Sequence, residues 1–416
     1  MTPTGQFHLV TLGCPKNEVD SDKLAGTLVA DGMVPTDRVE DAELIVVNTC
    51  AFVEDARRES IDTVLALADE RQAGARLVVT GCMAERYGTE LADELPEVDQ
   101  VVGFGVPVVM GKTRSNGAPP PVMDLLNLPR PASTRPWAYV KVAEGCDRAC
   151  GYCAIPSFRG PQRSRSPESV LAEVDGLGVR EVVLVAQDLA AYGRDQGVGE
   201  KAIVALLGAV VDRVDWVRLL YLYPSEVTDP LVDAVCASGV PYFDLSLQHV
   251  SRPLLRRMRR WGDGDRFSAL VERIRRREPD ATFRSNFIVG YPGETEEDHD
   301  ELLAFVADVG LDWCGFFAFS EEVGTHAEGL DGAVAAPLVA ERLRELGELQ
   351  DAITASKRDA LIGRQVEVLV DEPGWGRTHR EAPEIDGLVE VPAELPVGEF
   401  ATLTVTGAAG PDLEAA

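Results

Sequence analysis

The 416-residue sequence lacks long hydrophobic runs and is short of basic residues. No stretch approaches the run of about 18 apolar residues expected of a transmembrane helix, and the chain does not start with the basic, apolar and small-residue segments of a secretory signal. Lysine and arginine total 40 against 69 acidic residues, which gives a formal net charge of −29. These absences predict a cytoplasmic protein without membrane association.

The shortage of positive charge also restricts the possible partners. Nucleic-acid-binding proteins usually present a basic face, so this chain must either form such a face locally or prefer a basic partner. The alternative is that the acidity serves only solubility.

The length and the hydrophobic content of 45% predict two or three domains with packed cores. Residues 1–112 alternate short apolar runs with helical patterns, which predicts a small open α/β sheet. Its strands are expected at 7–12, 44–49 and 76–80, and its helices near 19–32 and 53–73. Residues 113–136, rich in proline and polar residues, predict a linker.

Residues 137–355 contain six strand candidates with helices between most of them. Six β/α units fit either an incomplete version of the eight-unit barrel or a doubly wound sheet, and periodicity does not distinguish the two. The strands are expected at 138–143, 181–186, 217–222, 242–247, 282–289 and 313–319.

A charged helical pattern covers residues 334–360. The alternating segments after it predict a small all-β module, and we place this domain at 356–416. From residue 361 onward, acidic residues outnumber basic ones 11 to 3. The last segment, GAAGPDLEAA, is expected to be a short tail after the final strand.

The sequence contains eight cysteines, which favours metal ligation or catalysis over disulfides in a cytosolic chain. Cys146, Cys150 and Cys153 follow the first strand of the central region with the spacing C-x3-C-x2-C. Thiolates are the ligands of iron–sulfur clusters, and three in one loop leave one iron of a four-iron cluster free for a substrate. Zinc would require a fourth Cys or His nearby, and the next histidine downstream is His249.

Cys14, Cys50 and Cys82 lie far apart in the sequence, but each directly follows a predicted strand. Ligands bind outside the carboxyl ends of strands in an open α/β sheet, and neighbouring strands lie about 4.8 Å apart, so three thiols there can converge on one cluster. Gly13 and Gly81 precede two of them and would allow close approach of the backbone. The alternative is three buried structural cysteines. The other two cysteines are expected to be small core residues: Cys236 and Cys314.

The cysteine loop, with an aromatic residue before its last cysteine, resembles the radical S-adenosylmethionine (SAM) superfamily. The resemblance implies a partial (β/α)6 barrel in which Cys146, Cys150 and Cys153 hold a 4Fe–4S cluster. The open iron of that cluster binds SAM, and one electron then cleaves SAM to methionine and a 5′-deoxyadenosyl radical.

The segments LGCPKNEVDS, VVNTCAFVEDA and VTGCMAERY resemble the N-terminal domain of the methylthiotransferase family within that superfamily. This resemblance implies a second, auxiliary 4Fe–4S cluster on Cys14, Cys50 and Cys82. In the family, sulfur attached to the auxiliary cluster is methylated and then delivered to a substrate carbon.

Further motifs, including CAIPSFRGPQRSRS and SNFIVGYPGETEEDH, resemble the RimO branch of the family, and the tail resembles a TRAM domain. The branch implies methylthiolation of the β-carbon of one aspartate in the twelfth small-subunit ribosomal protein, with a reducing electron-transfer protein as a second partner. An acidic tail would repel phosphates and attract a lysine-rich ribosomal protein.

Other functions remain open. A MiaB-like enzyme acting on transfer-RNA adenosines would need a basic groove across the barrel mouth and the tail. A two-cluster electron carrier needs no open iron and should have four cysteines per cluster. A zinc-bound structural protein is the third alternative.

Polar residues at predicted strand ends are further site candidates, because barrel enzymes bind substrates there. The resemblance implies that such residues contact SAM, and we assign Gln187, Arg284 and Ser285 to cofactor binding, with Tyr152 packed over the cluster. Such residues are also often simple caps. The remaining candidates are Asp188, Gln248, His249, Asn286, Arg159 and Arg165. His249 has no visible partner in the sequence, so we expect a structural role for it.

Overall fold

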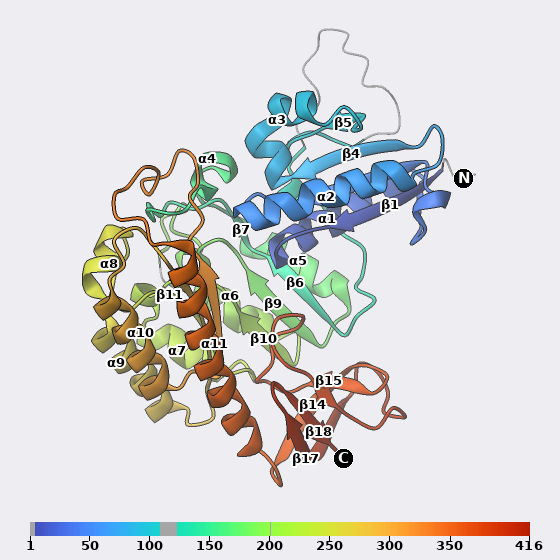
Figure 1. The fold of residues 1–416 in the computed structure, drawn as a ribbon. Helices are drawn as coiled ribbons and strands as arrows, with labels where there is room; N and C mark the ends of the chain where they lie inside the picture. The colour runs from blue at the N-terminus through green and yellow to red at the C-terminus, as the bar shows by residue number, and fades with distance from the viewer. Residues whose placement is uncertain (1–4, 109–122, 200) are drawn as a thin grey trace.

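The computed structural model describes residues 5–108, 123–199 and 201–416. An N-terminal parallel sheet, a central partial barrel and a small C-terminal barrel follow one another along the molecule (Figure 1). None of the helices in these ranges is both long and apolar enough to cross a membrane. Residues 113–122 of the predicted linker lie outside the described residues, and its remainder includes the short helix η2 (Leu125–Asn127).

Five parallel strands form the N-terminal sheet in the order β2-β1-β3-β4-β5, which confirms the predicted open α/β sheet. Helix α1 covers one face and helices α2 and α3 cover the other, so every residue of the central strand β3 is buried. The sequence missed β2 and β5, because two-residue strands carry no readable alternation. The elements are β1 (Gln6–Thr11), α1 (Pro15–Ala30), β2 (Val34–Pro35), η1 (Val39–Asp41), β3 (Leu44–Thr49), α2 (Glu54–Glu70), β4 (Arg76–Gly81), α3 (Cys82–Glu94) and β5 (Gln100–Val101).

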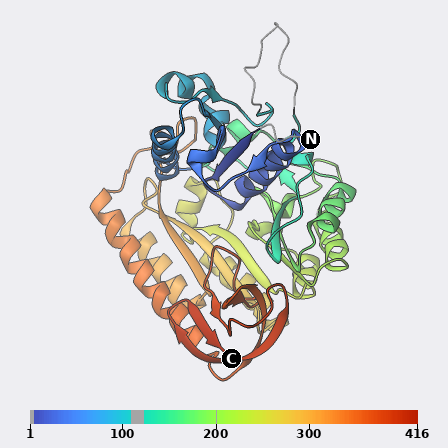
Figure 2. The same ribbon diagram turned by 90° about the vertical axis from the view of Figure 1, so that its right-hand side faces the viewer.

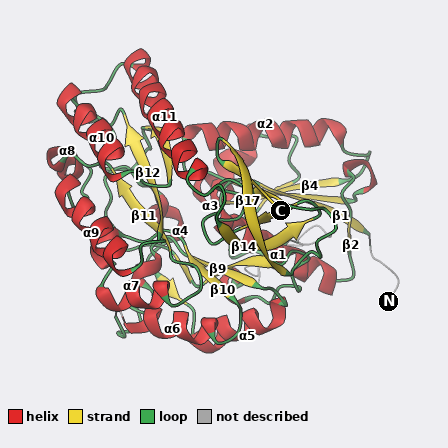
Figure 3. Cartoon of the chain, turned by 90° about the horizontal axis from the view of Figure 1, so that it is seen from below, coloured by secondary structure: helices red, strands yellow, loops and turns green. Residues whose placement is uncertain are grey.

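The central region is an open barrel of six consecutive parallel strands, as predicted. Two three-stranded sheets, β6-β9-β10 and β11-β12-β13, are joined where Leu222 pairs with Leu245. Helices cover the outside of the strands in an arc (Figure 3). The strands are β6 (Trp137–Lys141), β9 (Glu181–Val185), β10 (Trp216–Leu219), β11 (Tyr242–Gln248), β12 (Thr282–Val289) and β13 (Trp313–Ala318).

A local signal in the sequence explains where helix α10 of the barrel begins. Helix α10 begins after Thr295, whose side chain and that of Asp298 each bond the other's backbone N–H in a capping box. Helix α11 continues past residue 355, so the boundary expected there falls inside a helix. The remaining elements are β7 (Ala143–Glu144), α4 (Ile155–Arg159), β8 (Arg163–Ser164), α5 (Pro167–Leu177), η3 (Leu189–Ala191), α6 (Lys201–Val211), η4 (Pro224–Glu226), α7 (Asp229–Cys236), α8 (Arg252–Arg257), α9 (Gly264–Arg277), α10 (Glu296–Val309) and α11 (Ala336–Asp359).

The C-terminal strands close into a barrel in the order β14-β15-β16-β18-β17. The expectation of a short terminal tail is wrong: the chain turns at Gly410 and forms β18, which pairs with both β16 and β17. The sequence signal was weak because β18 is short and acidic. The strands are β14 (Gln365–Glu372), β15 (Trp375–Arg377), β16 (Val389–Glu390), β17 (Phe400–Ala409) and β18 (Asp412–Ala415).

Deleting residues 412–416 is expected to open the C-terminal barrel. Strand β18 bridges β16 and β17, and its Leu413 is buried in the barrel core, a burial that contributes about 1.5–3 kcal/mol. Hydrogen exchange of the β17 amides should therefore become much faster. The exposed Glu414→Gln substitution serves as the control, and unchanged exchange in the truncated chain would show that β18 is dispensable.

The β15–β16 loop (residues 378–388) leaves the C-terminal barrel and enters the floor of the central barrel, where the strands begin (Figure 2). The hydroxyl of Tyr139 donates to the carbonyl of Pro383 at 2.8 Å, and the hydroxyl of Tyr242 donates to Asp386 at 2.6 Å. The loop therefore closes the end of the barrel opposite the cysteines.

Candidate functional site

Cys14, Cys50 and Cys82 lie at one edge of the N-terminal sheet. Strands β1, β3 and β4 are adjacent and parallel, so the cysteines that follow them share the carboxyl edge. Cys14 caps helix α1 and Cys82 begins helix α3. Cys50 and Cys82 are each only 7% exposed. The sheet topology thus brings together three thiols that are distant in the sequence.

Two glycines make this approach possible. Gly13 has φ +98°, and a Cβ there would lie 2.8 Å from the Cβ of Cys50. Gly81 has φ +92°, and a Cβ there would lie 2.6 Å from the backbone nitrogen of Thr49. Both positions require glycine, for its backbone conformation and for its lack of a side chain.

The three thiols differ in how readily they ionise. Burial alone would raise the pKa of Cys14, but Lys16, Arg159 and backbone donors outweigh it and lower that pKa. Burial raises the pKa of Cys50 to about 11 and also raises the pKa of Cys82. Cys14 is therefore the thiol of this set that most readily becomes a thiolate.

Cys146, Cys150 and Cys153 lie in the loop between β7 and β8, which pair with each other and close the base of the loop. The N–H of Cys153 donates to the carbonyl of Cys150 at 3.2 Å, and the N–H of Cys146 donates to that of Gly160 at 3.1 Å. Burial raises the pKa of Cys146 to about 11 and that of Cys153 to about 12. Metal ligation would displace these protons, because thiolates are the ligands.

One arginine within this loop and one outside it pack against the same aromatic ring. Arg260 donates to the sulfur of Cys150 at 3.4 Å, and its guanidinium lies 4.2 Å from the ring centroid of Tyr223. Arg148 lies 3.9 Å from the same centroid. Burial raises the pKa of Tyr152 well above its ordinary value, so its hydroxyl stays protonated. Arg260 and Tyr223 could not be predicted from the sequence, because they belong to no recognisable spacing.

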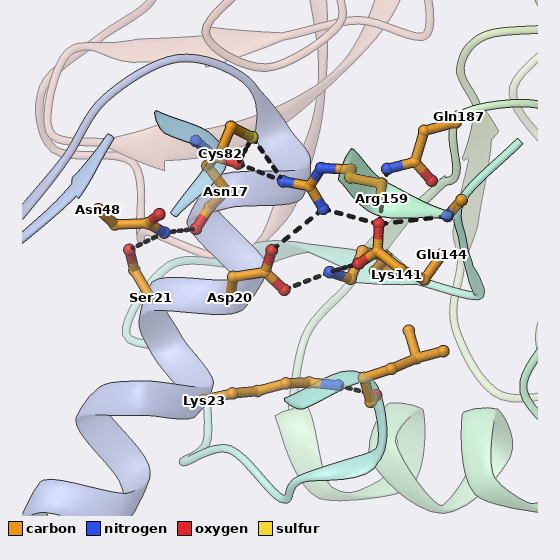
Figure 4. Close-up of polar contacts among 12 residues, drawn as sticks. Asn17, Asp20, Ser21, Lys23, Asn48, Cys82, Lys141, Glu144, Arg159 and Gln187 are labelled. Atoms are coloured by element: carbon orange, nitrogen blue, oxygen red, sulfur yellow. Dashed lines mark hydrogen bonds and ion pairs between the residues drawn. The ribbon is translucent and has the colours of Figure 1, made fainter. Parts of the chain in front are cut away.

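A buried polar network connects Cys82 with Glu144 at the base of the other cysteine loop (Figure 4). Arg159 donates to the sulfur of Cys82 at 3.0 Å and to Glu144 at 2.7 Å. Glu144 also accepts from Lys141 at 2.7 Å and from Gln187 at 2.9 Å. Arg159 was a sequence candidate, but nothing in the sequence indicated that it would contact the other domain.

The residues assigned to cofactor binding separate into two groups. Tyr152 lies in the cysteine loop. The amide nitrogen of Gln187 donates to Glu144 at the base of that loop, and the buried Oε1 of Gln187 has no partner among the described residues. Arg284 and Ser285 lie in the first half of β12, away from the strand end. Arg284 pairs with Asp386 at 3.3 Å, and Ser285 donates to a backbone carbonyl of β11 at 2.8 Å. Arg284 therefore contacts the loop that closes the barrel floor, whereas Ser285 bonds within the barrel sheet.

The other strand-end candidates have mixed surroundings. Asp188 accepts from Arg148 at 2.6 Å, beside the cysteine loop. Gln248 ends β11 with a left-handed backbone, φ 72°, which is uncommon for a residue with a side chain. The buried Oδ1 of Asn286 has no partner in the described part of the chain. Arg165 is buried and pairs with a carboxylate of helix α5 at 2.7 Å.

His249 has the surroundings of a neutral core histidine. It is fully buried, and its Nδ1 accepts from the backbone N–H of Ser251 at 3.1 Å. Burial lowers its pKa to about 4.

The free energy of unfolding is expected to fall as the pH drops from about 6.5 towards 4, partly because of His249. The unfolded chain takes up a proton on this histidine near pH 6.5, whereas the folded chain resists protonation down to about pH 4. The expected contribution is about 3 kcal/mol. Urea unfolding of the unmodified chain and His249→Gln at pH 7 and pH 4.5 measures it. The exposed His326→Gln is the control, and an identical pH dependence in His249→Gln would refute the assignment.

The sequence matches known families along most of its length. Residues 6–103 match the model of "Uncharacterized protein family UPF0004", residues 140–306 match the radical SAM superfamily, and residues 362–416 match the TRAM domain. The ribosomal protein uS12 methylthiotransferase RimO of Kineococcus radiotolerans is 43% identical over 97% of this chain and 96% of its own length. That of Moorella thermoacetica is 43% identical over 96% of each.

Among solved structures, the cobalamin-dependent SAM radical enzyme OxsB has a TM-score of 0.50 and 11% identity, over 84% of this chain and 56% of that chain. This likeness concerns the fold alone. Radical SAM proteins use SAM and a 4Fe–4S cluster, and these two cofactors accompany the superfamily match. The chain belongs to the radical SAM methylthiotransferase family, in which its relatives are ribosomal protein uS12 methylthiotransferases.

Proposed function

We propose that the chain transfers a methylthio group to the β-carbon of one aspartate in ribosomal protein uS12. The observation that carries this proposal is the similarity to uS12 methylthiotransferases across nearly the whole chain, all three domains included. The substrate implies action in the cytoplasm, with a reducing electron-transfer protein as the source of electrons.

The cysteines fit the cofactors that this function requires. Among the described residues each site offers three thiols, a donor set that leaves one iron of a 4Fe–4S cluster without a protein ligand. We assign one cluster, with SAM, to Cys146, Cys150 and Cys153. The auxiliary cluster is assigned to the other set, Cys14, Cys50 and Cys82. In the described part of the chain no three ligand side chains converge as tightly as one metal ion requires, whereas a four-iron cluster is wider than a single ion.

When bound, these cofactors supply a radical that removes hydrogen from an unactivated C–H bond, which no general base could deprotonate. The chain's own residues provide the surroundings. Arg260 contacts Cys150 beside Tyr223 and supplies positive charge there, whereas Arg148, within the loop, pairs with Asp188 and Glu226. The unpartnered Oε1 of Gln187 is available to accept a hydrogen bond from SAM. The loop that closes the barrel floor limits access of water from that end.

The surface charge of the C-terminal barrel supports a protein substrate over transfer RNA. Its exposed charged side chains are seven glutamates and one arginine: Glu367, Glu372, Glu384, Glu390, Glu394, Glu399, Glu414 and Arg364. Two further arginines are engaged internally, Arg377 with Glu181 and Arg380 with Asp280. A surface of this charge repels phosphates and attracts a basic protein. The match to methylthiotransferases, together with the two sets of three cysteines in this chain, also counts against an electron carrier.

Mass spectrometry under anaerobic conditions tests this function. The reconstituted chain is incubated with SAM, a reductant, sulfide and uS12, and in parallel with transfer RNA. We expect uS12 to gain the mass of one methylthio group in place of one hydrogen, mapped to a single aspartate. A gain on transfer RNA alone would overturn the substrate assignment, and SAM cleavage without a gain on either would retain only the radical chemistry.

A further inference from the structure

Arg159 connects two parts of the molecule that the sequence keeps separate. It is the last residue of helix α4, which follows the loop of Cys146, Cys150 and Cys153. Its guanidinium nonetheless lies in the N-terminal domain, 3.0 Å from the sulfur of Cys82 and 2.8 Å from Oδ1 of Asn17. Its side chain is only 3% exposed.

The opposite edge of the same guanidinium contacts the base of the cysteine loop. Nη1 donates to Glu144 at 2.7 Å, and Glu144 lies just before Cys146. Asp20 lies 3.5 Å away, and the ring of Phe104 packs against the guanidinium with its centroid at 4.5 Å. One side chain therefore contacts a cysteine of one set and the segment that carries the other (Figure 4).

The geometry of the contacts directs one edge of this cation at the sulfur. Asp20 and Glu144 both contact the buried ammonium of Lys141, so the two carboxylates already share a second cation. Among the described residues, the Nη2 group of Arg159 bonds Cys82 and Asn17 and no carboxylate. An arginine stays charged when buried, and a hydrogen bond from a charged donor to a thiolate is strengthened in a low dielectric.

We propose that Arg159 is a positioning residue that joins the two cysteine sites and stabilises negative charge on the auxiliary cluster through Cys82. The inference rests on the proposed function, which assigns a cluster to Cys14, Cys50 and Cys82. Hydrogen bonds to cluster sulfurs and the local charge set the reduction potential of an iron–sulfur centre. Arg159 therefore makes the auxiliary cluster easier to reduce and fixes its place relative to the other cysteine loop.

A purely structural ion pair between Arg159 and Glu144 predicts something different. Such a pair would affect folding stability but would leave the potential of the auxiliary cluster unchanged. The potential therefore separates the two roles.

The test uses the full-length chain with Cys146, Cys150 and Cys153 all replaced by alanine, so that only the auxiliary cluster is present. Into this background we introduce Arg159→Gln, Arg159→Lys and, as a matched control, Arg163→Gln. Arg163 lies a short distance along the same segment and is exposed, and its side chain pairs with Asp124 at 2.8 Å. Iron and sulfide content and a potentiometric titration followed by electron paramagnetic resonance are measured for each.

We expect Arg159→Gln to shift the midpoint potential to a more negative value, Arg159→Lys to recover part of the shift, and Arg163→Gln to match the background. In the chain that keeps all six proposed ligand cysteines, Arg159→Gln should lower methylthio transfer about 10- to 100-fold, the usual effect of removing a partner of a metal ligand. Equal potentials for Arg159→Gln and the background, at equal iron content, would overturn the inference while leaving the proposed function intact. A background chain that binds no iron would instead refute the auxiliary cluster itself. If Arg159→Gln does not fold, Arg159→Lys replaces it, because lysine keeps the charge but loses the forked geometry. We then expect a midpoint potential more negative than that of the background, and an equal potential would overturn the inference.

Discussion

Cys150→Ala is expected to abolish both SAM cleavage and methylthio transfer, whereas Cys82→Ala is expected to abolish transfer and leave SAM cleavage active. The physical reason is the separation of the two sets of thiols. Cys150 belongs to the loop between β7 and β8 in the barrel, and Cys82 begins helix α3 in the N-terminal sheet. Removing one thiol leaves its own cluster with only two protein ligands and leaves the other set complete.

The measurement is the amount of 5′-deoxyadenosine and of modified uS12 formed by each variant under the same anaerobic conditions, together with the iron content. Cys236→Ala is the matched control, because Cys236 ends helix α7 and belongs to neither set. It should retain both products. Loss of SAM cleavage in Cys82→Ala, with its iron at the other site intact, would contradict the division of labour between the two sets.

The second large effect concerns the junction between the barrel and the C-terminal domain. Glu181 is completely buried at the start of β9 and accepts from Arg218 at 2.9 Å and from Arg377 at 2.7 Å. Glu181→Gln keeps the shape but removes the charge, so two buried guanidiniums lose their shared counter-charge. Breaking a buried pair in this way costs about 3–5 kcal/mol.

The loss should appear as an earlier unfolding transition in denaturant and in heat at pH 7. Burial alone would raise the pKa of Glu181, but Arg377 and Arg218 outweigh it and lower that pKa. Its contribution is therefore fully present above its unfolded pKa of about 4.5 and disappears as the pH falls through the lower folded value. Glu181→Gln should lack this acid-sensitive part. The exposed Glu390→Gln on β16 is the control, and equal stability of the two variants would show that the pair is not stabilising.

Local signals in the sequence were enough to predict the main elements of the fold. The runs at 44–49 and 282–289 coincide with β3 and β12, because a buried parallel strand is a continuous apolar or alternating segment of limited length. The capping residues before α10 act within one turn of helix and could be identified without a structure. The short strand β18 could not, since four residues carry too little pattern.

The sequence by itself determined where the candidate ligands lie in the fold, through cysteine spacing, their positions after strands and the glycines Gly13 and Gly81. Only the tertiary structure decided how these residues are connected. The contact of Arg159 with Cys82, the pairing of Glu181 with Arg377 and the assignment of Arg284 to the domain junction all join positions remote in the chain. Such contacts depend on how whole domains pack, and no periodicity or local spacing encodes them, because the side chains meet only after the three domains have docked.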